Sequence, residues 1–212
     1  MEMMLQTKNL CKSFKHQEAV HKVSLNVEKG KVYGLLGPNG AGKSTTLKML
    51  TGILKPSSGE IYFDGKPWSR NILSEIGALI ENPPIYDNLS AWENLKVRAL
   101  LLGVEDDRIS EVLKIVSLTN TGKKRAGQFS LGMKQRLGIA AAIYEAPELI
   151  LLDEPTNGLD EAGREQICGL LRKERERGAL IVLASHDSAI LETVSDEIYS
   201  ISGGRIKELK RQ

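Results

Sequence analysis

Residues 37–45 read Gly37-Pro38-Asn39-Gly40-Ala41-Gly42-Lys43-Ser44-Thr45. They fit the pattern G-x-x-x-x-G-K-[ST], which is typical of a loop that binds the phosphates of a nucleotide. The glycines let the backbone turn tightly, so that its amide N–H groups can surround an anion. Lys43 adds a positive charge for the outer phosphates, and the hydroxyl of Ser44 can ligate Mg²⁺.

The residues on either side of this loop support the same interpretation. Residues 31–36 contain an apolar run typical of a buried parallel strand. The following residues place Leu47 and Leu50 at helical spacing and end at Gly52. Strand, glycine loop and helix in this order favour phosphate binding, because a helix N-terminus attracts anions. The alternative, a glycine-rich turn that binds nothing, is disfavoured by the register and the flanks together.

The composition is that of an ordinary globular protein. The chain has 212 residues, of which 41 % are hydrophobic and 26 % charged, enough for one domain with a sizeable core. A net charge of +2 gives no electrostatic reason to expect nucleic acid as a partner. The N-terminus lacks a signal-peptide pattern, and no apolar run approaches the ~18 residues of a membrane span. We therefore expect any membrane role to be exerted from outside the bilayer.

Apolar segments alternate with helical ones along the rest of the chain. Residues 3–36 predict mainly β structure, and the apolar runs at 76–80, 149–152 and 179–184 predict further strands. From about 84 to 145 the pattern is helical. This alternation predicts an α/β fold with a parallel sheet that binds ligands at the carboxyl ends of its strands.

Acidic and imidazole side chains follow two of these predicted strands. Asp153 and Glu154 follow the run at 149–152, and His186 follows the run at 179–184. An aspartate so placed can hold Mg²⁺, and the second acid can polarise the water that attacks a γ-phosphate. His186 can donate a hydrogen bond to that phosphate. Solvated acids and a structural histidine are the alternatives, and the upstream phosphate loop disfavours them.

Phe14 is an aromatic residue in an exposed-looking setting, between Ser13 and Lys15. Its ring can stack on a nucleotide base, or it can pack at the end of a strand. The residues around it leave both interpretations open.

Five motifs in this order resemble those of the ATP-binding cassette (ABC) ATPases. They lie at 37–45, 129–136, 153–156, 157–160 and 185–187. The resemblance extends from about residue 14 to the C-terminus. It implies a P-loop NTPase (RecA-like) core with an N-terminal antiparallel β subdomain and an inserted α-helical subdomain. Residues 1–212 would then form a single nucleotide-binding domain, with the core at about 1–83 and 146–212 and the helical subdomain at about 84–145.

The resemblance implies a role for each residue of the site within one subunit. Phe14 would stack on adenine, while the loop at 37–45 would hold the phosphates of ATP and, through its serine, Mg²⁺. Asp153 would support the metal, Glu154 would act as the general base, and His186 would touch the γ-phosphate.

The same resemblance implies that a second copy completes the site. Two subunits would form a head-to-tail homodimer with two ATP molecules between them. Ser130 and Gly132 would complete the partner's nucleotide site, and Asp160 would lie at the dimer contact. A helix start with a hydroxyl at its N-cap is also a sound anion site on physical grounds.

The signature motif of the family, usually L-S-G-G-Q, is altered in this chain. Phe129, Leu131 and Met133 replace its leucine, its first glycine and its glutamine. Ser130 and Gly132, whose small size permits close approach to a phosphate, are retained. We therefore expect the motif to keep its function.

A second departure falls at Glu81, where the family usually has a glutamine that reaches Mg²⁺ and the attacking water. Glutamate keeps the oxygen ligand and adds a charge, but loses the amide donor. A solvated loop residue is the alternative. We hypothesise that Glu81 contacts the metal site and couples the nucleotide state to the helical subdomain that begins at Pro84.

Glu81 and the segments 86–95 and 129–136 resemble the ATPase subunits of lantibiotic-immunity and bacitracin-resistance exporters. Such subunits pair with separate membrane-spanning permeases that remove antimicrobial peptides. The resemblance implies ATP and Mg²⁺ as cofactors, a cytoplasmic location on the inner face of the membrane, and a permease docked at 85–102, around Trp92. One rival is an ABC ATPase that exports a lipid, ion or drug. Another is a soluble regulatory cassette protein, which a single cassette without a basic tract disfavours.

Overall fold

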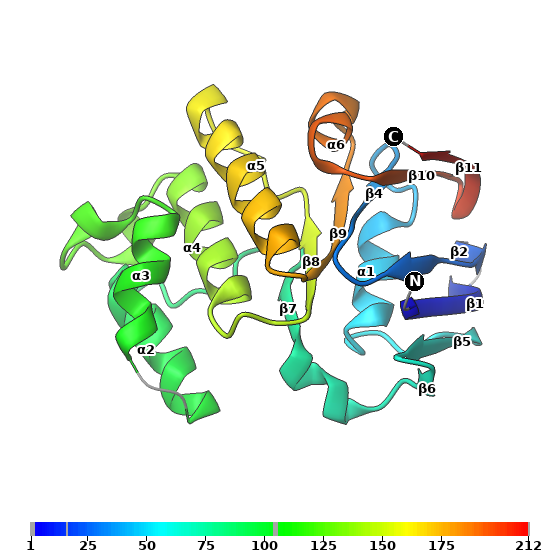
Figure 1. The fold of residues 1–212 in the computed structure, drawn as a ribbon, viewed down its shortest axis with the longest axis horizontal. Coiled ribbons are helices and arrows are strands. Elements are labelled where there is room, and N and C mark those ends of the chain that lie inside the picture. Colours follow the sequence, from blue (N-terminus) through cyan, green and yellow to red (C-terminus); the bar gives the residue numbers. More distant parts are fainter. Residues whose placement is uncertain (1–2, 16, 104–105, 212) are drawn as a thin grey trace.

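The computed structural model describes residues 3–15, 17–103 and 106–211. They form two β-sheets, with helices packed between and around them (Figure 1). The smaller sheet is antiparallel, with the order β2-β1-β5-β6 and with β3 paired to β1. Its strands are β1 (Met3–Phe14), β2 (Gln17–Val23), β3 (Asn26–Glu28), β5 (Ser58–Phe63) and β6 (Lys66–Pro67).

The larger sheet has the strand order β11-β10-β4-β9-β8-β7. All its neighbouring strands are parallel except the C-terminal pair β10–β11, which forms a hairpin. The apolar runs of the sequence form its four inner and edge parallel strands β4, β7, β8 and β9, since a strand covered on both faces carries mainly apolar side chains. The strands are β4 (Val32–Leu36), β7 (Ile76–Leu79), β8 (Leu149–Asp153), β9 (Leu180–Ser185), β10 (Glu197–Ser202) and β11 (Arg205–Arg211).

Two hydrophobic clusters cover the two faces of the larger sheet. Along β8, Leu149 and Leu151 belong to the cluster shared with α1 and the small sheet. Ile150 and Leu152 point the other way, into the cluster formed with helices α2 to α6. This alternation follows from the two-residue period of a strand. The helices are α1 (Lys43–Leu50), α2 (Ala91–Leu102), α3 (Asp107–Ile115), α4 (Leu131–Ile143), α5 (Glu161–Glu176) and α6 (Ser188–Val194).

The helices α2, α3 and α4 gather at one end of the molecule, away from the small sheet (Figure 1). Ser90 caps α2 in a capping box: its hydroxyl accepts from the backbone N–H of Glu93, whose carboxylate accepts from the N–H of Ser90. We retain as a proposal the division into a core at 1–83 and 146–212 and a helical subdomain at 84–145. The sequence did not predict β6 or the 3₁₀ turns Arg70–Glu75, Thr119–Thr121 and Ala126–Gln128.

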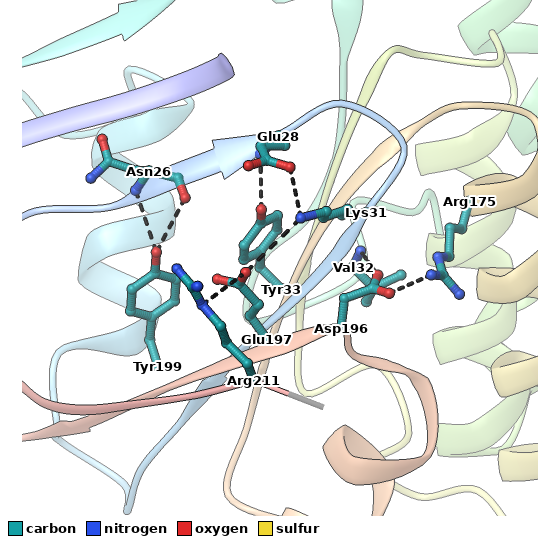
Figure 2. A network of polar contacts seen from close by, with 10 residues as sticks. All are labelled: Asn26, Glu28, Lys31, Val32, Tyr33, Arg175, Asp196, Glu197, Tyr199 and Arg211. Atoms are coloured by element: carbon teal, nitrogen blue, oxygen red, sulfur yellow. Dashed lines mark hydrogen bonds and ion pairs between the residues drawn. The ribbon is translucent and has the colours of Figure 1, made fainter. Parts of the chain in front are cut away.

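A polar network joins the two sheets at the amino ends of the parallel strands (Figure 2). The Tyr33 hydroxyl accepts from the backbone N–H of Glu28 at 3.0 Å, and burial raises the pKa of Tyr33 to about 12. The Tyr199 hydroxyl donates to the carbonyl of Asn26 at 3.2 Å. Asp196 accepts from the first N–H of β4 at 2.8 Å. The network lies opposite the carboxyl ends of the strands, so it anchors β4 and leaves the other edge free for a site.

Candidate nucleotide-binding site

The loop between β4 and α1 is a cradle that only glycine can form at two points. A Cβ added to Gly37 would lie 2.3 Å from the carbonyl oxygen of Ile201. A Cβ added to Gly42 would lie 2.6 Å from the carbonyl oxygen of Ala19, and Gly42 has a left-handed φ of 103°. Gly40, with φ 78°, has open space where its Cβ would be. The loop is therefore packed against the rest of the chain at Gly37 and Gly42 and open at Gly40.

Lys43 is folded back onto this cradle. Its side chain is 5 % exposed, and Nζ donates to the carbonyl oxygens of Gly37 at 2.6 Å and Pro38 at 3.2 Å. Nζ also lies 3.5 Å from Oε1 of Glu154. The cation faces a cavity of about 230 Å³, which is lined by Ala19, Asn39, Gly40, Ala41, Gly42, Lys43, Ser44, Thr45, Asp153 and Glu154.

Asp153 is the last residue of β8 and is buried beside the start of α1. Burial raises the pKa of its carboxyl, and a hydrogen bond from the Ser44 hydroxyl and the charge of Lys43 oppose that rise. Within the described residues, Oδ1 of Asp153 has no hydrogen-bond partner although it is buried.

These ligands fit Mg²⁺. A hydroxyl and a carboxylate are the hard oxygen ligands that this ion prefers, and the unpartnered Oδ1 of Asp153 would gain a partner from it. In the described part of the chain, no group of three or more His, Cys, Asp and Glu side chains could hold a metal by itself. Ser44 and Asp153 would hold the ion together with the phosphates of a bound nucleotide.

Glu154 lies just after β8 and is held by residues from two other elements. Its Oε2 accepts from Oγ of Ser185 at 3.0 Å, and its Oε1 lies 2.9 Å from Nδ1 of His186. Its backbone carbonyl accepts from Nε2 of Gln135, on α4, at 3.1 Å. The backbone of Glu154 is left-handed, with φ 48°, and the residue lines the cavity together with Lys43.

His186 follows β9 and reaches the same region from the other side. Its side chain is 53 % exposed and lines a hollow of about 470 Å³ together with Leu36, Gly37, Pro38 and Asn39. The structure thus brings Asp153, Glu154 and His186 together around the loop of Lys43, as the strand ends of the sequence predicted.

Glu81 follows β7, which pairs with β8, so the residue leaves a strand end next to that of Asp153. The backbone amide of Glu81 lowers the pKa of the Asp153 carboxyl. Its own carboxylate forms an ion pair with Lys48 of α1 and is 54 % exposed. The residue is therefore adjacent to the candidate metal site, while its proposed contact with Mg²⁺ stays a prediction.

Phe14 is exposed at the end of β1, with Nζ of Lys12 5.2 Å from the centroid of its ring. The partner strand β2 supplies Ala19 to the wall of the phosphate cavity. An exposed ring on this hairpin is available to a nucleotide base, so base stacking by Phe14 remains our prediction.

Ser130, Gly132 and Asp160 line a separate hollow of about 290 Å³. Ser130 is the N-cap of α4 and accepts from the N–H of Met133 at 3.2 Å. Asp160 is the N-cap of α5 and lies 3.8 Å from Arg136. A Cβ on Gly132 would lie 2.8 Å from a backbone carbonyl, which explains why glycine is kept there. This hollow shares no lining residue with the phosphate cavity. Within one subunit, the hollow at Ser130 and the phosphate cavity are therefore two separate sites.

Sequence reasoning missed the residues that hold Glu154 and Glu81 in place. Gln135 lies 19 positions before Glu154, and Lys48 lies 33 positions before Glu81. Ser185 was recognised only as part of a strand-end motif. No local pattern pairs residues at such separations, and only the parallel order β7-β8-β9 signals which strand ends are neighbours.

Comparison with known proteins agrees with the nucleotide-binding site that the geometry indicates. The sequence profile of the ABC transporter family matches residues 20–157. The chain belongs to this family, and its fold is that of a P-loop NTPase, which confirms the predicted family and fold class.

Two curated relatives cover nearly all of this chain. The lantibiotic transport ATP-binding protein SrtF of Streptococcus pyogenes is 46 % identical over 203 residues, which are 96 % of this chain and 89 % of SrtF. The bacitracin transport ATP-binding protein BcrA of Bacillus licheniformis is 43 % identical over 213 residues, which are 98 % of this chain and 70 % of BcrA.

A solved structure agrees closely with the fold. The dimeric ATP-binding cassette MJ0796, described as a post-hydrolysis state with bound ADP and Pi, has a TM-score of 0.90 and 28 % sequence identity. The match covers 98 % of both chains. MJ0796 is thus a protein of the same architecture that was solved as a dimer with bound nucleotide.

Proposed function

We propose that this chain binds and hydrolyses ATP as the nucleotide-binding subunit of an exporter for a lantibiotic or another antimicrobial peptide. One observation carries the enzymatic part of the proposal: Lys43, Asp153, Glu154 and His186 converge on one glycine cradle. The names of SrtF and BcrA, which concern lantibiotic and bacitracin transport, support the class of cargo.

The contacts of the cavity assign a task to each side chain. When ATP enters, Lys43 exchanges the carbonyls of Gly37 and Pro38 for phosphate oxygens. Bound Mg²⁺, held by Ser44 and Asp153, would neutralise charge on the phosphates. Phe14 is proposed to stack on the adenine.

Glu154 is the proposed general base. Ser185 fixes one oxygen of its carboxylate, which leaves Oε1, beside His186, to accept a proton from the attacking water. His186 is half exposed, and by turning away from Glu154 it would bring an N–H donor to the γ-phosphate, where such a donor stabilises the charge of the transition state.

A second copy of the chain completes the proposed site. The hollow at Ser130, Gly132 and Asp160 opens at the N-terminus of α4, where backbone N–H groups and the helix dipole favour an anion. In a head-to-tail homodimer this hollow would close over the γ-phosphate held by the partner's cradle. Two active sites would then form together at one interface.

The permease is proposed to dock on the helical end of the molecule. A hollow of about 200 Å³ lies there, lined by Pro84, Ile85, Tyr86, Asn94, Leu95, Val97, Arg98, Leu101, Leu137 and Ala141. Of its lining residues, Tyr86 and Leu101 expose 52 % and 78 % of their surface, and Trp92, also on α2 like Leu101, exposes 42 %. An apolar patch of this kind on a globular protein is typical of a protein interface.

None of the helices in the described ranges is long and apolar enough to cross a membrane. We therefore propose that the membrane path belongs to separate permease subunits, with this chain on the cytoplasmic face of the cell membrane. An exporter for a lipid, ion or drug would use the same ATPase site, and its permease would differ. A regulatory cassette without a permease is the remaining rival.

The test of the enzymatic proposal is Glu154→Gln. The variant should bind MgATP while its kcat falls at least about 100-fold, the usual contribution of a general base. It should also accumulate as a dimer with MgATP in size-exclusion chromatography. The matched control is Glu111→Gln, an exposed acid on α3, which should behave as wild type. Full hydrolysis by Glu154→Gln would place the general base elsewhere.

Cargo is tested separately, in cells that carry the chain with its permease. Expression of the pair should protect sensitive cells from a lantibiotic or bacitracin, and Glu154→Gln should abolish that protection. Co-purification with ribosomes in place of a membrane protein would favour the regulatory rival.

A further inference from the structure

Lys48 and Glu81 form an ion pair beside the phosphate cavity, and the proposed mechanism does not use it. Lys48 lies on α1 four residues after Ser44, so the two side chains leave the same face of the helix one turn apart. Helical side chains lean toward the helix N-terminus, which carries Lys48 toward the phosphate end of α1. The pair therefore lies next to the candidate ligands of Mg²⁺.

Glu81 lies beside that site because β7 and β8 are neighbours in the sheet. Leu79 pairs with Leu152 in the parallel register, so Glu81 and Asp153 leave adjacent strand ends, and the Glu81 amide lowers the pKa of the Asp153 carboxyl. The backbone of Glu81 is left-handed, with φ 62°, a conformation that residues other than glycine rarely adopt. The carboxylate that pairs with Lys48 therefore belongs to a loop that borders the candidate metal-binding acid.

The negative charge around the cavity explains why Lys48 pairs with Glu81. Asp153 and Glu154 already place two carboxylates in the cavity that receives a polyanion. A third carboxylate at Glu81 would repel both them and the phosphates, and Lys48 cancels its charge. A glutamine at this position, being neutral, would need no such cation.

We propose that Lys48 is a positioning residue that competes with the metal ion for the carboxylate of Glu81. Lys48 holds that carboxylate on α1 before the metal binds, and the carboxylate moves to Mg²⁺ when metal and nucleotide are bound. This inference rests on the proposed function, because it requires an ATP–Mg²⁺ site at Ser44 and Asp153.

The test measures metal binding directly. Mn²⁺ replaces Mg²⁺, and electron paramagnetic resonance follows the free ion during titration of the complex with a non-hydrolysable ATP analogue. The proteins are wild type, Lys48→Met, Glu81→Gln and the double variant, with Lys48→Arg as the conservative control. Both side chains are partly exposed, so we expect every variant to fold and to bind the analogue.

Lys48→Met should tighten Mn²⁺ binding in both backgrounds, because removing a nearby cation always favours a metal ion. If Lys48 also competes for Glu81, the Mn²⁺ affinity should rise further, but only in the background that contains Glu81. This additional rise should be about threefold, the scale of one partly exposed ion pair. Lys48→Arg should bind Mn²⁺ as the wild type does.

Equal tightening with and without Glu81→Gln would overturn the inference and leave the proposed function intact. Weaker Mn²⁺ binding by Lys48→Met would also overturn it, since Lys48 would then aid the metal. Failure of the wild type to bind the analogue and Mn²⁺ would instead contradict the proposed function on which the inference rests.

Discussion

Replacing Ser185 with alanine removes a hydrogen bond from the proposed general base. Ser185 is buried at the end of β9, and its Oγ donates to Oε2 of Glu154 at 3.0 Å. A hydrogen bond to a charged group contributes about 1.5–3 kcal/mol. Because the side chain of Glu154 is 16 % exposed, water can replace part of this contact, and the lower end applies. A loss of about 1.5 kcal/mol corresponds to a fall in kcat of a little over tenfold.

The assay is phosphate release at saturating MgATP, with the affinity for ATP measured separately. Ser185 acts through Glu154 and is not among the residues that line the phosphate cavity, so we expect Kd for ATP to stay within about twofold. The control is Ser188→Ala, which removes an exposed hydroxyl from α6. An unchanged kcat for Ser185→Ala, or a loss confined to KM, would refute this reasoning.

Three further predictions follow from the same contacts. Gly42→Ala should lower the free energy of unfolding by more than about 1 kcal/mol, since the added Cβ would meet the carbonyl of Ala19; Gly40→Ala, in open space, should lower it less in the same denaturant titration. Asp153→Asn should raise the Tm of the nucleotide-free protein at neutral pH, because burial raises the pKa of this carboxyl. The folded state then binds a proton more readily than the unfolded state, so stability falls as pH rises through the folded pKa. The rise in Tm caused by Asp153→Asn should therefore shrink as pH is lowered through that pKa. A rise in Tm that is independent of pH would show that burial of the charged carboxylate is not its cause. Leu101→Ser should reduce co-purification with the permease while ATP affinity is kept, and unchanged co-purification would place the docking surface elsewhere.

Much of this fold could be predicted because its determinants are local. The glycine loop follows a fully apolar strand, and the sheet neighbours β8 and β9 each end in polar residues. Parallel strands leave their carboxyl ends at one edge, so the proximity of Asp153, Glu154 and His186 to the loop followed from order alone.

What the sequence could not supply were contacts between distant side chains and short irregular elements. The two-residue strand β6 exists because it pairs with β5, and its own residues, Lys66 and Pro67, carry no strand signal. The pairing of Lys48 with Glu81 depends on where β7 ends relative to α1, which packing of the sheet decides. The sequence left Phe14 between two interpretations, and its exposure in the structure favours base stacking as a proposal.

Binding of MgATP to the purified chain, measured by isothermal titration calorimetry, tests the central claim most directly. The account predicts one ATP per chain and at least a tenfold loss of affinity in Lys43→Met, since the cation that faces the cavity is removed. Lys207→Met, which removes an exposed lysine of β11, should bind as wild type does. Equal affinity of Lys43→Met and wild type, or no binding by either, would contradict the assignment of this cradle to ATP.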